Sequence, residues 1–323
     1  MTVNGIFIKN MIRKLIAAED HSIEVNELIT DEFLKYVVDF FKRIACAKLD
    51  NEGVTVDWYE KEFLSCDLPK RDLAIHAGLN EKTITNAYNS TQKVYVVEAS
   101  IEHYHKLKET IESLIEQNDV DVTLTIKFRG ISVDLNINES LIVINTLAVK
   151  RSAIRGGIWS TIGKQVEKPL MMTLCAIFQV PIKYYDQTNP PDFVRETDFF
   201  LRDDAGNSYR CEVKLSGKGN PESSDSAFRR YNHVLIGNKI SDKMKKQMDE
   251  ANIFWVELRS ENGYKKFEKL LNELSIQCKP YPDHRNLQED LDKILPLLLS
   301  DGIQASVKPD LSTVNSELLI ELD

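Results

Sequence analysis

Residues 196–218 read ETDFFLRDDAGNSYRCEVKLSGK, and this pattern predicts two short strands joined by a tight turn. Apolar and polar side chains alternate over residues 194–201 and again over residues 209–215, as they do along a half-buried strand. Between the two runs, residues 203–207 (DDAGN) have the composition of a turn. The segment therefore predicts a β-hairpin.

This hairpin would gather charged side chains. A turn centred on Ala205 and Gly206 places Asp198 roughly across from Glu212. Because side chains of a strand alternate between its two faces, Glu212 and Lys214 share one face. We therefore expect two carboxylates and one ammonium group within a short distance of one another.

Two carboxylates beside an ammonium group have a chemical use. Carboxylate oxygens can hold Mg²⁺, which keeps part of its water shell and can take a phosphate oxygen as well. The ion lowers the pKa of a bound water and offsets charge on a phosphoryl group. Lys214 could orient the attacking water or neutralise the transition state. The same residue types also form solvated ion pairs across strands, so the pattern alone leaves both interpretations open.

Composition narrows the class of protein. At 323 residues the chain is long enough for two domains, and its 42% hydrophobic and 28% charged residues are typical of a soluble globular protein. No run approaches the roughly 20 apolar residues of a membrane span, and the N-terminus lacks the layout of a secretory signal. The 5 cysteines are scattered and never in Cys-x-x-Cys spacing, which indicates a reduced compartment and predicts a cytoplasmic protein.

Charge is unevenly distributed along the chain. A net charge of −9 argues against indiscriminate binding to nucleic acid, but it leaves room for a basic cleft. The most one-sided segment spans residues 150–183, where Glu167 is the lone acid among six basic residues: Lys150, Arg151, Arg155, Lys164, Lys168 and Lys183. Such clustering suits contacts to phosphates, and it also suits a solvated basic face.

The first part of the chain is predicted to be helical. Residues 8–16 and 32–47 carry apolar residues at helical spacing, and residues 70–89 (KRDLAIHAGLNEKTITNAYN) predict a helix-turn-helix. Gly78 supplies the turn and Asn80 can cap the second helix. That helix would present five polar residues to DNA, which are Lys82, Thr83, Thr85, Asn86 and Asn89. A helical hairpin without DNA contact has the same pattern.

The remaining segments alternate between strands and helices. We expect a strand at 93–99, a helix at 101–115, a hairpin around Arg129 and Gly130, a helix over 156–178 that Pro169 kinks or divides, strands at 234–240 and 253–258, and helices at 242–251 and 264–274. This order predicts an α/β fold, α+β overall, with a mixed sheet flanked by helices. The expected domains are a mainly helical helix-turn-helix domain (1–119), a hairpin connector (120–150) and a sheet domain with a C-terminal extension (151–323).

Two further residues are candidates for the site. Glu167, on a helix packed against the hairpin, could supply another metal ligand or hold Lys214, or it could form a surface ion pair with Lys164 or Arg151. Lys218 lies in a loop of Gly, Ser and polar residues at 217–226, which could bind phosphate through its amides or simply be mobile.

Three runs carry a resemblance to a known family: GGIWSTIGKQVEKPLM (156–171), CEVKLSGKGNPES (211–223) and WVELRS (255–260). They resemble the CfrBI-type family of type II restriction endonucleases, and the Asp-Glu-x-Lys pattern resembles that of the PD-(D/E)xK nucleases. The resemblance implies a restriction-endonuclease-like sheet and Mg²⁺-dependent cleavage of both strands of double-stranded DNA at a short symmetric site. It also implies 5′-phosphate ends, a homodimer, and a cognate DNA methyltransferase as a functional partner in the same restriction-modification system.

By position, the resemblance assigns metal binding to Asp198 and Glu212 and the attacking water to Lys214, with Glu167 as a further catalytic candidate. The basic residues expected to contact DNA are Arg155, Lys164, Lys168 and Lys218. One departure stays open, because the family's Pro-Asp dipeptide occurs here as Pro191-Asp192, six residues before Asp198. Two other functions also fit the sequence: a helix-turn-helix DNA-binding regulator with a non-catalytic C-terminal domain, and a repair nuclease of the same fold without sequence specificity.

Overall fold

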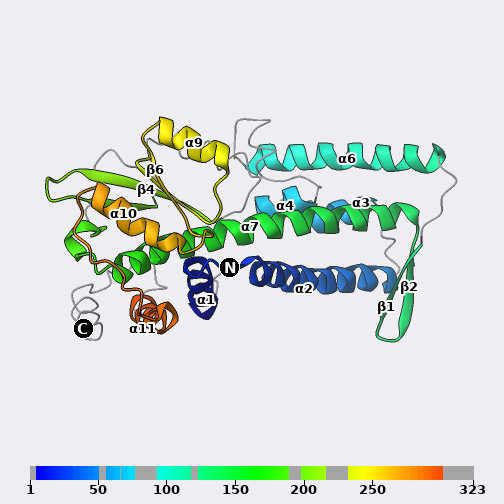
Figure 1. The fold of residues 1–323 in the computed structure, drawn as a ribbon. Coiled ribbons are helices and arrows are strands. Elements are labelled where there is room, and N and C mark those ends of the chain that lie inside the picture. Colours follow the sequence, from blue (N-terminus) through cyan, green and yellow to red (C-terminus); the bar gives the residue numbers. More distant parts are fainter. Residues whose placement is uncertain are drawn as a thin grey trace. The chain divides into compact units, whose positions relative to one another are not determined.

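The computed structural model describes residues 5–50, 56–65, 67–76, 93–117, 123–188, 198–215 and 232–300. By its internal contacts the chain divides into two units (Figure 1). The first unit combines Met1–Ile23 with Trp159–Asp323, and the second is Glu24–Ile158. One long helix, α7 (Ile137–Ile177), contributes residues to both units. The domain boundaries expected from the sequence stay predictions, and each unit is described by itself.

The first unit is built on a four-stranded mixed sheet. Its strands are β3 (Phe199–Arg202), β4 (Ser208–Lys214), β5 (Val234–Gly237) and β6 (Phe254–Glu257), and they lie side by side in that order. β3 pairs with β4 antiparallel, whereas β4 with β5 and β5 with β6 are parallel. The predicted fold class, helices around a mixed sheet, is confirmed.

One face of this sheet is apolar and buried. Three of its residues occupy matching register positions on neighbouring strands and are at most 1% exposed: Val213, Ile236 and Val256. The end of α7 lies on this side, where burial and the neighbouring Cys211 thiol raise the pKa of Cys175. Helix α7 therefore covers the face on which Cys211 and Val213 lie.

The opposite face of the sheet carries both an apolar cluster and charged side chains. Helix α9 (Asp242–Glu250) packs Met244 and Met248 against Leu235 of β5. Glu212 is paired with Leu235 and therefore points to the same face as this apolar cluster. The charged side chains of β4 thus lie beside a packed helix.

Further helices complete the first unit. They are α1 (Gly5–Ile16), the 3-10 helix η1 (Ile182–Tyr184), η2 (Gly263–Lys265), α10 (Lys266–Glu273) and α11 (Leu287–Ser300). Both α9 and α10 contact β6 beside the sheet (Figure 1). The sequence did not predict α11, which packs against α1 and forms an ion pair between Asp292 and Arg13. A proline inside a helix is unfavourable, so Pro296 argues locally against a helix here. Burial of Leu291, Ile294 and Leu295, all 0% exposed, favours the helix nevertheless.

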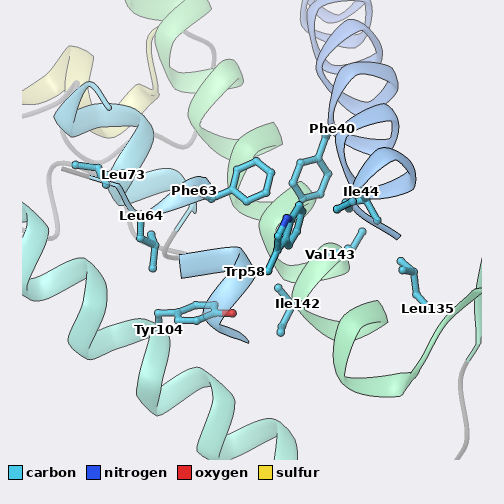
Figure 2. Packing of buried hydrophobic residues seen from close by; sticks show 11 residues of the cluster. Phe40, Ile44, Trp58, Phe63, Leu64, Leu73, Tyr104, Leu135, Ile142 and Val143 are labelled. Carbon is cyan, nitrogen blue, oxygen red and sulfur yellow. The ribbon is translucent and has the colours of Figure 1, made fainter. Parts of the chain in front are cut away.

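The second unit is mainly helical. It contains α2 (Ser22–Leu49), α3 (Val56–Phe63), α4 (Lys70–His76), α6 (Lys93–Gln117), the hairpin of β1 (Leu124–Phe128) with β2 (Ile131–Leu135), and the first part of α7. Every one of these elements contributes to one apolar core (Figure 2). Phe63 is central to it, because its ring meets the edges or faces of Phe40, Trp58 and His76 at 5.0–5.5 Å between centroids.

Local chemistry explains how the hairpin and α7 begin. Arg129 and Gly130 both have positive φ, 51° and 80°, as a tight hairpin turn requires, and the predicted hairpin is confirmed. Asn136 and Glu139 then cap α7 reciprocally: the Glu139 amide donates to Asn136 Oδ1 at 3.0 Å and the Asn136 amide donates to Glu139 Oε2 at 2.8 Å. Lys48 pairs with the same Glu139 carboxylate at 2.8 Å.

One predicted element is wrong. The Val-rich run at 93–99 suggested a strand, yet it is the first part of α6. Val97, Ile101 and Tyr104 recur at helical spacing, and Val97 and Tyr104 pack on the core of the second unit. Burial of this stripe outweighs the strand preference of the β-branched residues, whose helix penalty is small.

The predicted helix-turn-helix is described only in part. Its first helix is α4, where Leu73 and Ala74 are fully buried. The second helix, with Lys82, Thr83, Thr85 and Asn86, lies outside the described residues, so the motif stays a prediction. Within the described ranges, no helix has the length and hydropathy needed to cross a membrane.

Among the glycines that the structure describes, Gly263 allows the closest approach of backbone atoms. A methyl group on its Cα would lie 2.2 Å from the carbonyl oxygen of Glu257 and 2.6 Å from that of Leu258. We expect Gly263→Ala to lower the free energy of unfolding by about 3 kcal/mol, because backbone atoms cannot yield as a side chain can. Urea denaturation followed by circular dichroism measures this loss.

Gly156→Ala is the matched control for that variant, since its methyl group would meet nothing within 4 Å. It should stabilise the protein by about 0.5–1 kcal/mol through better helix propensity. An unchanged urea midpoint for Gly263→Ala would contradict the tight packing of this turn.

Candidate active site

The hairpin of β3 and β4 is fixed by its turn. Gly206 has a φ of 86°, which glycine adopts without strain. The Asp203 carboxylate accepts hydrogen bonds from the Asn207 amide at 2.8 Å and from the Tyr209 hydroxyl at 2.9 Å. Asp204 accepts from Lys183 Nζ at 2.7 Å, which ties the turn to η1. The turn therefore holds the two strands in one register.

This register brings the predicted residues together. Phe199 pairs with Cys211, so the next position along the two strands sets Asp198 opposite Glu212, as predicted. Asp198 Oδ2 accepts a hydrogen bond from the Val213 amide at 2.9 Å. The Asp198 carboxylate is thereby attached to β4 between Glu212 and Lys214.

Glu212 and Lys214 form a close ion pair on one face of β4. Lys214 Nζ lies 2.5 Å from Glu212 Oε1. The Glu212 side chain is only 1% exposed, whereas that of Lys214 is 29% exposed. A carboxylate so deeply buried requires a partner of opposite charge, because leaving it alone in the interior is costly. Lys214 supplies that charge and keeps one side toward solvent.

Glu167 joins this group from α7. Burial raises its pKa to about 7, and the charges of Asp198 and Glu212 add to the rise while Lys214 and Lys164 oppose it. The charges that act on Glu167 are therefore those of the hairpin, Asp198, Glu212 and Lys214, together with Lys164. We call Glu167, Asp198, Glu212 and Lys214 the charged cluster.

The donor set of the charged cluster suits a hard divalent cation. Glu212 forms an ion pair with Lys214, and the charges of Asp198 and Glu212 are one cause of the raised pKa of Glu167. Oxygen ligands of this kind are those that Mg²⁺ prefers. Among the residues that the structure describes, no three His, Cys, Asp or Glu side chains already stand close enough to ligate one ion. Metal binding by these residues therefore stays a prediction.

The predicted DNA-contacting residues are only partly described. Arg155, Lys164 and Lys168 are exposed on α7. Lys164 lies three residues before Glu167 and therefore on the same side of α7, whereas Lys168 is the next residue and points to a different side. Lys218 lies outside the described residues, as does Asp192, the alternative to Asp198.

One contact was missed by the sequence interpretation. Asn232 lies two residues before the first residue of β5, is 5% exposed, and its Nδ2 approaches Glu212 Oε2 at 3.5 Å. A single Asn shortly before an apolar strand carries no signal of such a role. Its position follows only from the parallel pairing of β5 with β4.

The raised pKa of Glu167 predicts a dependence of stability on pH. Because the folded state binds this proton more tightly than the unfolded chain does, the resulting stability is fully present below about pH 4.5 and is lost as the pH rises through 7. Glu167→Gln cannot ionise. In EDTA, the free energy of unfolding of this variant should rise relative to that of the unmutated protein as the pH goes from 5 to 8. The expected rise is about 1–2 kcal/mol after allowance for solvent screening.

Chemical denaturation at the two pH values measures this gain. Glu273→Gln, at the exposed end of α10, controls for the loss of one negative charge. Equal pH dependence of Glu167→Gln and the unmutated protein would contradict a raised pKa of Glu167, and with it the burial of this carboxyl beside Asp198 and Glu212.

Comparison with known proteins adds the family. The family model described as CfrBI restriction endonuclease matches residues 6–245, which include the whole charged cluster. The run at 255–260 lies beyond the matched segment. No curated protein and no solved structure matches the chain significantly. Since the match spans most of the sequence, the chain belongs to the CfrBI restriction endonuclease family, a family of nucleases that act on DNA.

Proposed function

We propose that this protein is a type II site-specific restriction endonuclease of the cytoplasm. It would use Mg²⁺ to hydrolyse phosphodiester bonds in both strands of DNA at a short symmetric site, leaving 5′-phosphate ends. The observation that supports this most is the charged cluster, where Asp198 and Glu212 face each other across the hairpin and Lys214 pairs with Glu212 at 2.5 Å. The family match supports the same chemistry.

In this proposal Asp198 and Glu212 hold the metal. Bound there, Mg²⁺ lowers the pKa of a coordinated water and offsets charge on the phosphate oxygens. Glu212 is well suited to this task because its carboxylate is buried and held in place by Lys214 and the sheet. The hydrogen bond from the Val213 amide orients the Asp198 carboxylate.

Lys214 has the position of a residue that acts on the attacking water. Its ammonium group is anchored to Glu212, and the Lys214 side chain is 29% exposed, so the group can donate to a water or to a phosphate oxygen at the surface. Attack by that water in line with the leaving group breaks the bond to the 3′ oxygen and leaves a 3′-hydroxyl. The charge that develops on the phosphorus is neutralised by Lys214.

Glu167 has two uses in the proposal. With a pKa of about 7 it can take or release a proton at neutral pH, which suits a residue beside an activated water. When ionised it can add a third carboxylate to the metal ligands or hold Lys214. Both uses follow from its place in the charged cluster.

DNA would reach the charged cluster along exposed basic residues. Lys164 and Lys168 flank Glu167 on α7, and Arg155 is exposed earlier in the same helix. Because the net charge of the chain is −9, these local cations must supply the phosphate contacts. Lys218 and the second helix of the predicted helix-turn-helix, with Lys82, Thr83, Thr85 and Asn86, would add further contacts.

The proposal implies two partners besides DNA. A cut in both strands at a symmetric site needs two active sites related by a twofold axis, which a homodimer provides. A cognate DNA methyltransferase in the same system would modify the recognition site. That partnership is functional and requires no physical contact between the two enzymes.

The first test is cleavage of a sequenced plasmid with and without Mg²⁺. The unmutated protein should give discrete bands with Mg²⁺ and none in EDTA. Lys214→Ala should lose at least about 100-fold in cleavage rate because a group that stabilises transition-state charge is gone. Binding of the same DNA in EDTA, measured by fluorescence anisotropy, should be retained.

Lys269→Ala is the matched control, since Lys269 is an exposed lysine of α10 away from the charged cluster. A smear in place of bands would indicate a nuclease without sequence specificity. DNA binding without cleavage by the unmutated protein would indicate a regulator and contradict the proposal.

A second test separates the two candidate acids. Asp198→Ala should abolish cleavage, because it removes the carboxylate opposite Glu212, whereas Asp192→Ala should retain activity within about tenfold. Rates at saturating Mg²⁺ decide between them. An inactive Asp192→Ala with an active Asp198→Ala would show that the first metal-binding acid is Asp192.

A further inference from the structure

A glycine inside α7 lies directly beneath the Glu167 carboxylate. Gly163 is four residues before Glu167, and side chains of a helix lean toward its N-terminus. A methyl group placed on Gly163 would lie 3.0 Å from Glu167 Oε1 and 3.8 Å from its Cδ. Apart from the two residues next to Gly163 and the backbone of the helix itself, no other described atom comes within 4 Å of that methyl position. The space above Gly163 is therefore occupied by one group, the Glu167 carboxylate.

Glycine is an unfavourable residue for this place on general grounds. In the interior of a helix it lowers stability relative to alanine, because glycine loses more backbone conformational entropy when the chain folds. Nothing in the backbone of Gly163 requires glycine, because it has ordinary helical conformation and no positive φ. The contact with Glu167 is the remaining reason for the missing side chain.

We propose that Gly163 is a positioning residue: its missing side chain leaves the space in which the Glu167 carboxylate turns back along α7 toward Asp198 and Glu212. This inference rests on the proposed function of the charged cluster. It adds a specific requirement, namely that the residue one turn before Glu167 be small.

The expected effect of a methyl group here is displacement of the acid. At 3.0 Å the contact is tighter than ordinary van der Waals packing, and the Glu167 carboxylate is the movable end of a flexible side chain. The helix itself should gain from the better helix former. Gly163→Ala should therefore raise the melting temperature by about 2 °C and lower the cleavage rate at limiting Mg²⁺ by about tenfold.

Opposite signs for stability and activity separate positioning from a structural role. Affinity for Mg²⁺ without DNA, measured by calorimetry, should fall in Gly163→Ala together with the cleavage rate. Gly156→Ala is the matched control in the same helix, because its methyl group would touch nothing within 4 Å. That variant should gain the same stability and keep the activity and metal affinity of the unmutated protein.

A double-mutant cycle tests whether the effect passes through Glu167. In a Glu167→Ala background, Gly163→Ala should change neither Mg²⁺ affinity nor cleavage, since no carboxylate is left to displace. An equal loss in both backgrounds would overturn the inference. So would Gly163→Ala with unmutated metal affinity and cleavage.

Affinity for Mg²⁺ keeps this inference distinguishable from the proposed function. Absence of Mg²⁺ binding and cleavage in the unmutated protein would overturn the proposed function, whereas unchanged Mg²⁺ affinity of Gly163→Ala beside an active unmutated protein would overturn the role of Gly163 alone.

Discussion

The antiparallel register between β3 and β4 is the constraint on which the charged cluster depends. Side chains alternate between the two faces of a strand, so a slip of one residue would turn Glu212 and Lys214 to the apolar face. It would also separate Asp198 from Glu212. The turn prevents this slip through the hydrogen bonds of Asp203 and the positive φ of Gly206. Residues that take no part in the chemistry thus decide where the chemical groups lie.

The charged cluster is held together against its own repulsion. Asp198 and Glu212 both act to raise the pKa of Glu167, while Lys214 and Lys164 oppose them. Concentrating like charges beside a buried strand is unfavourable for folding, and such strain is common where residues serve a function. The apolar face formed by Val213 and its neighbours on β5 and β6 supplies the burial that offsets it.

Local patterns predicted what local physics determines. The turn at Arg129 and Gly130 and the hairpin register follow from periodicity and turn chemistry, and the structure has them as predicted. The helix predicted over 156–178 is part of α7, which begins much earlier, at Ile137. The segment 93–99 was predicted wrongly because β-branched residues favour a strand locally, whereas the core of the second unit selects a helix.

Long-range arrangement was harder to predict than local structure. Helix α11 was missed because Pro296 is locally unfavourable for a helix, whereas the packing of α11 against α1 is a long-range contact. Sequence spacing indicated that Glu167 could reach the hairpin, but it left a surface ion pair equally open. Only the packing of α7 on the sheet decides that Asp198 and Glu212 are its electrostatic neighbours.

Helix α7 has a composition that is unusual for a helix. A helix that contains Pro169 and three glycines (Gly156, Gly157 and Gly163) is a poor helix by propensity, yet it runs unbroken from Ile137 to Ile177. Its last turns are kept helical by packing, since every residue from Leu170 to Phe178 is buried. Tertiary burial therefore leaves the middle of α7 free to carry residues that a helix would otherwise exclude. Gly163 occupies such a position, and in the role proposed for it the missing side chain leaves space for the Glu167 carboxylate.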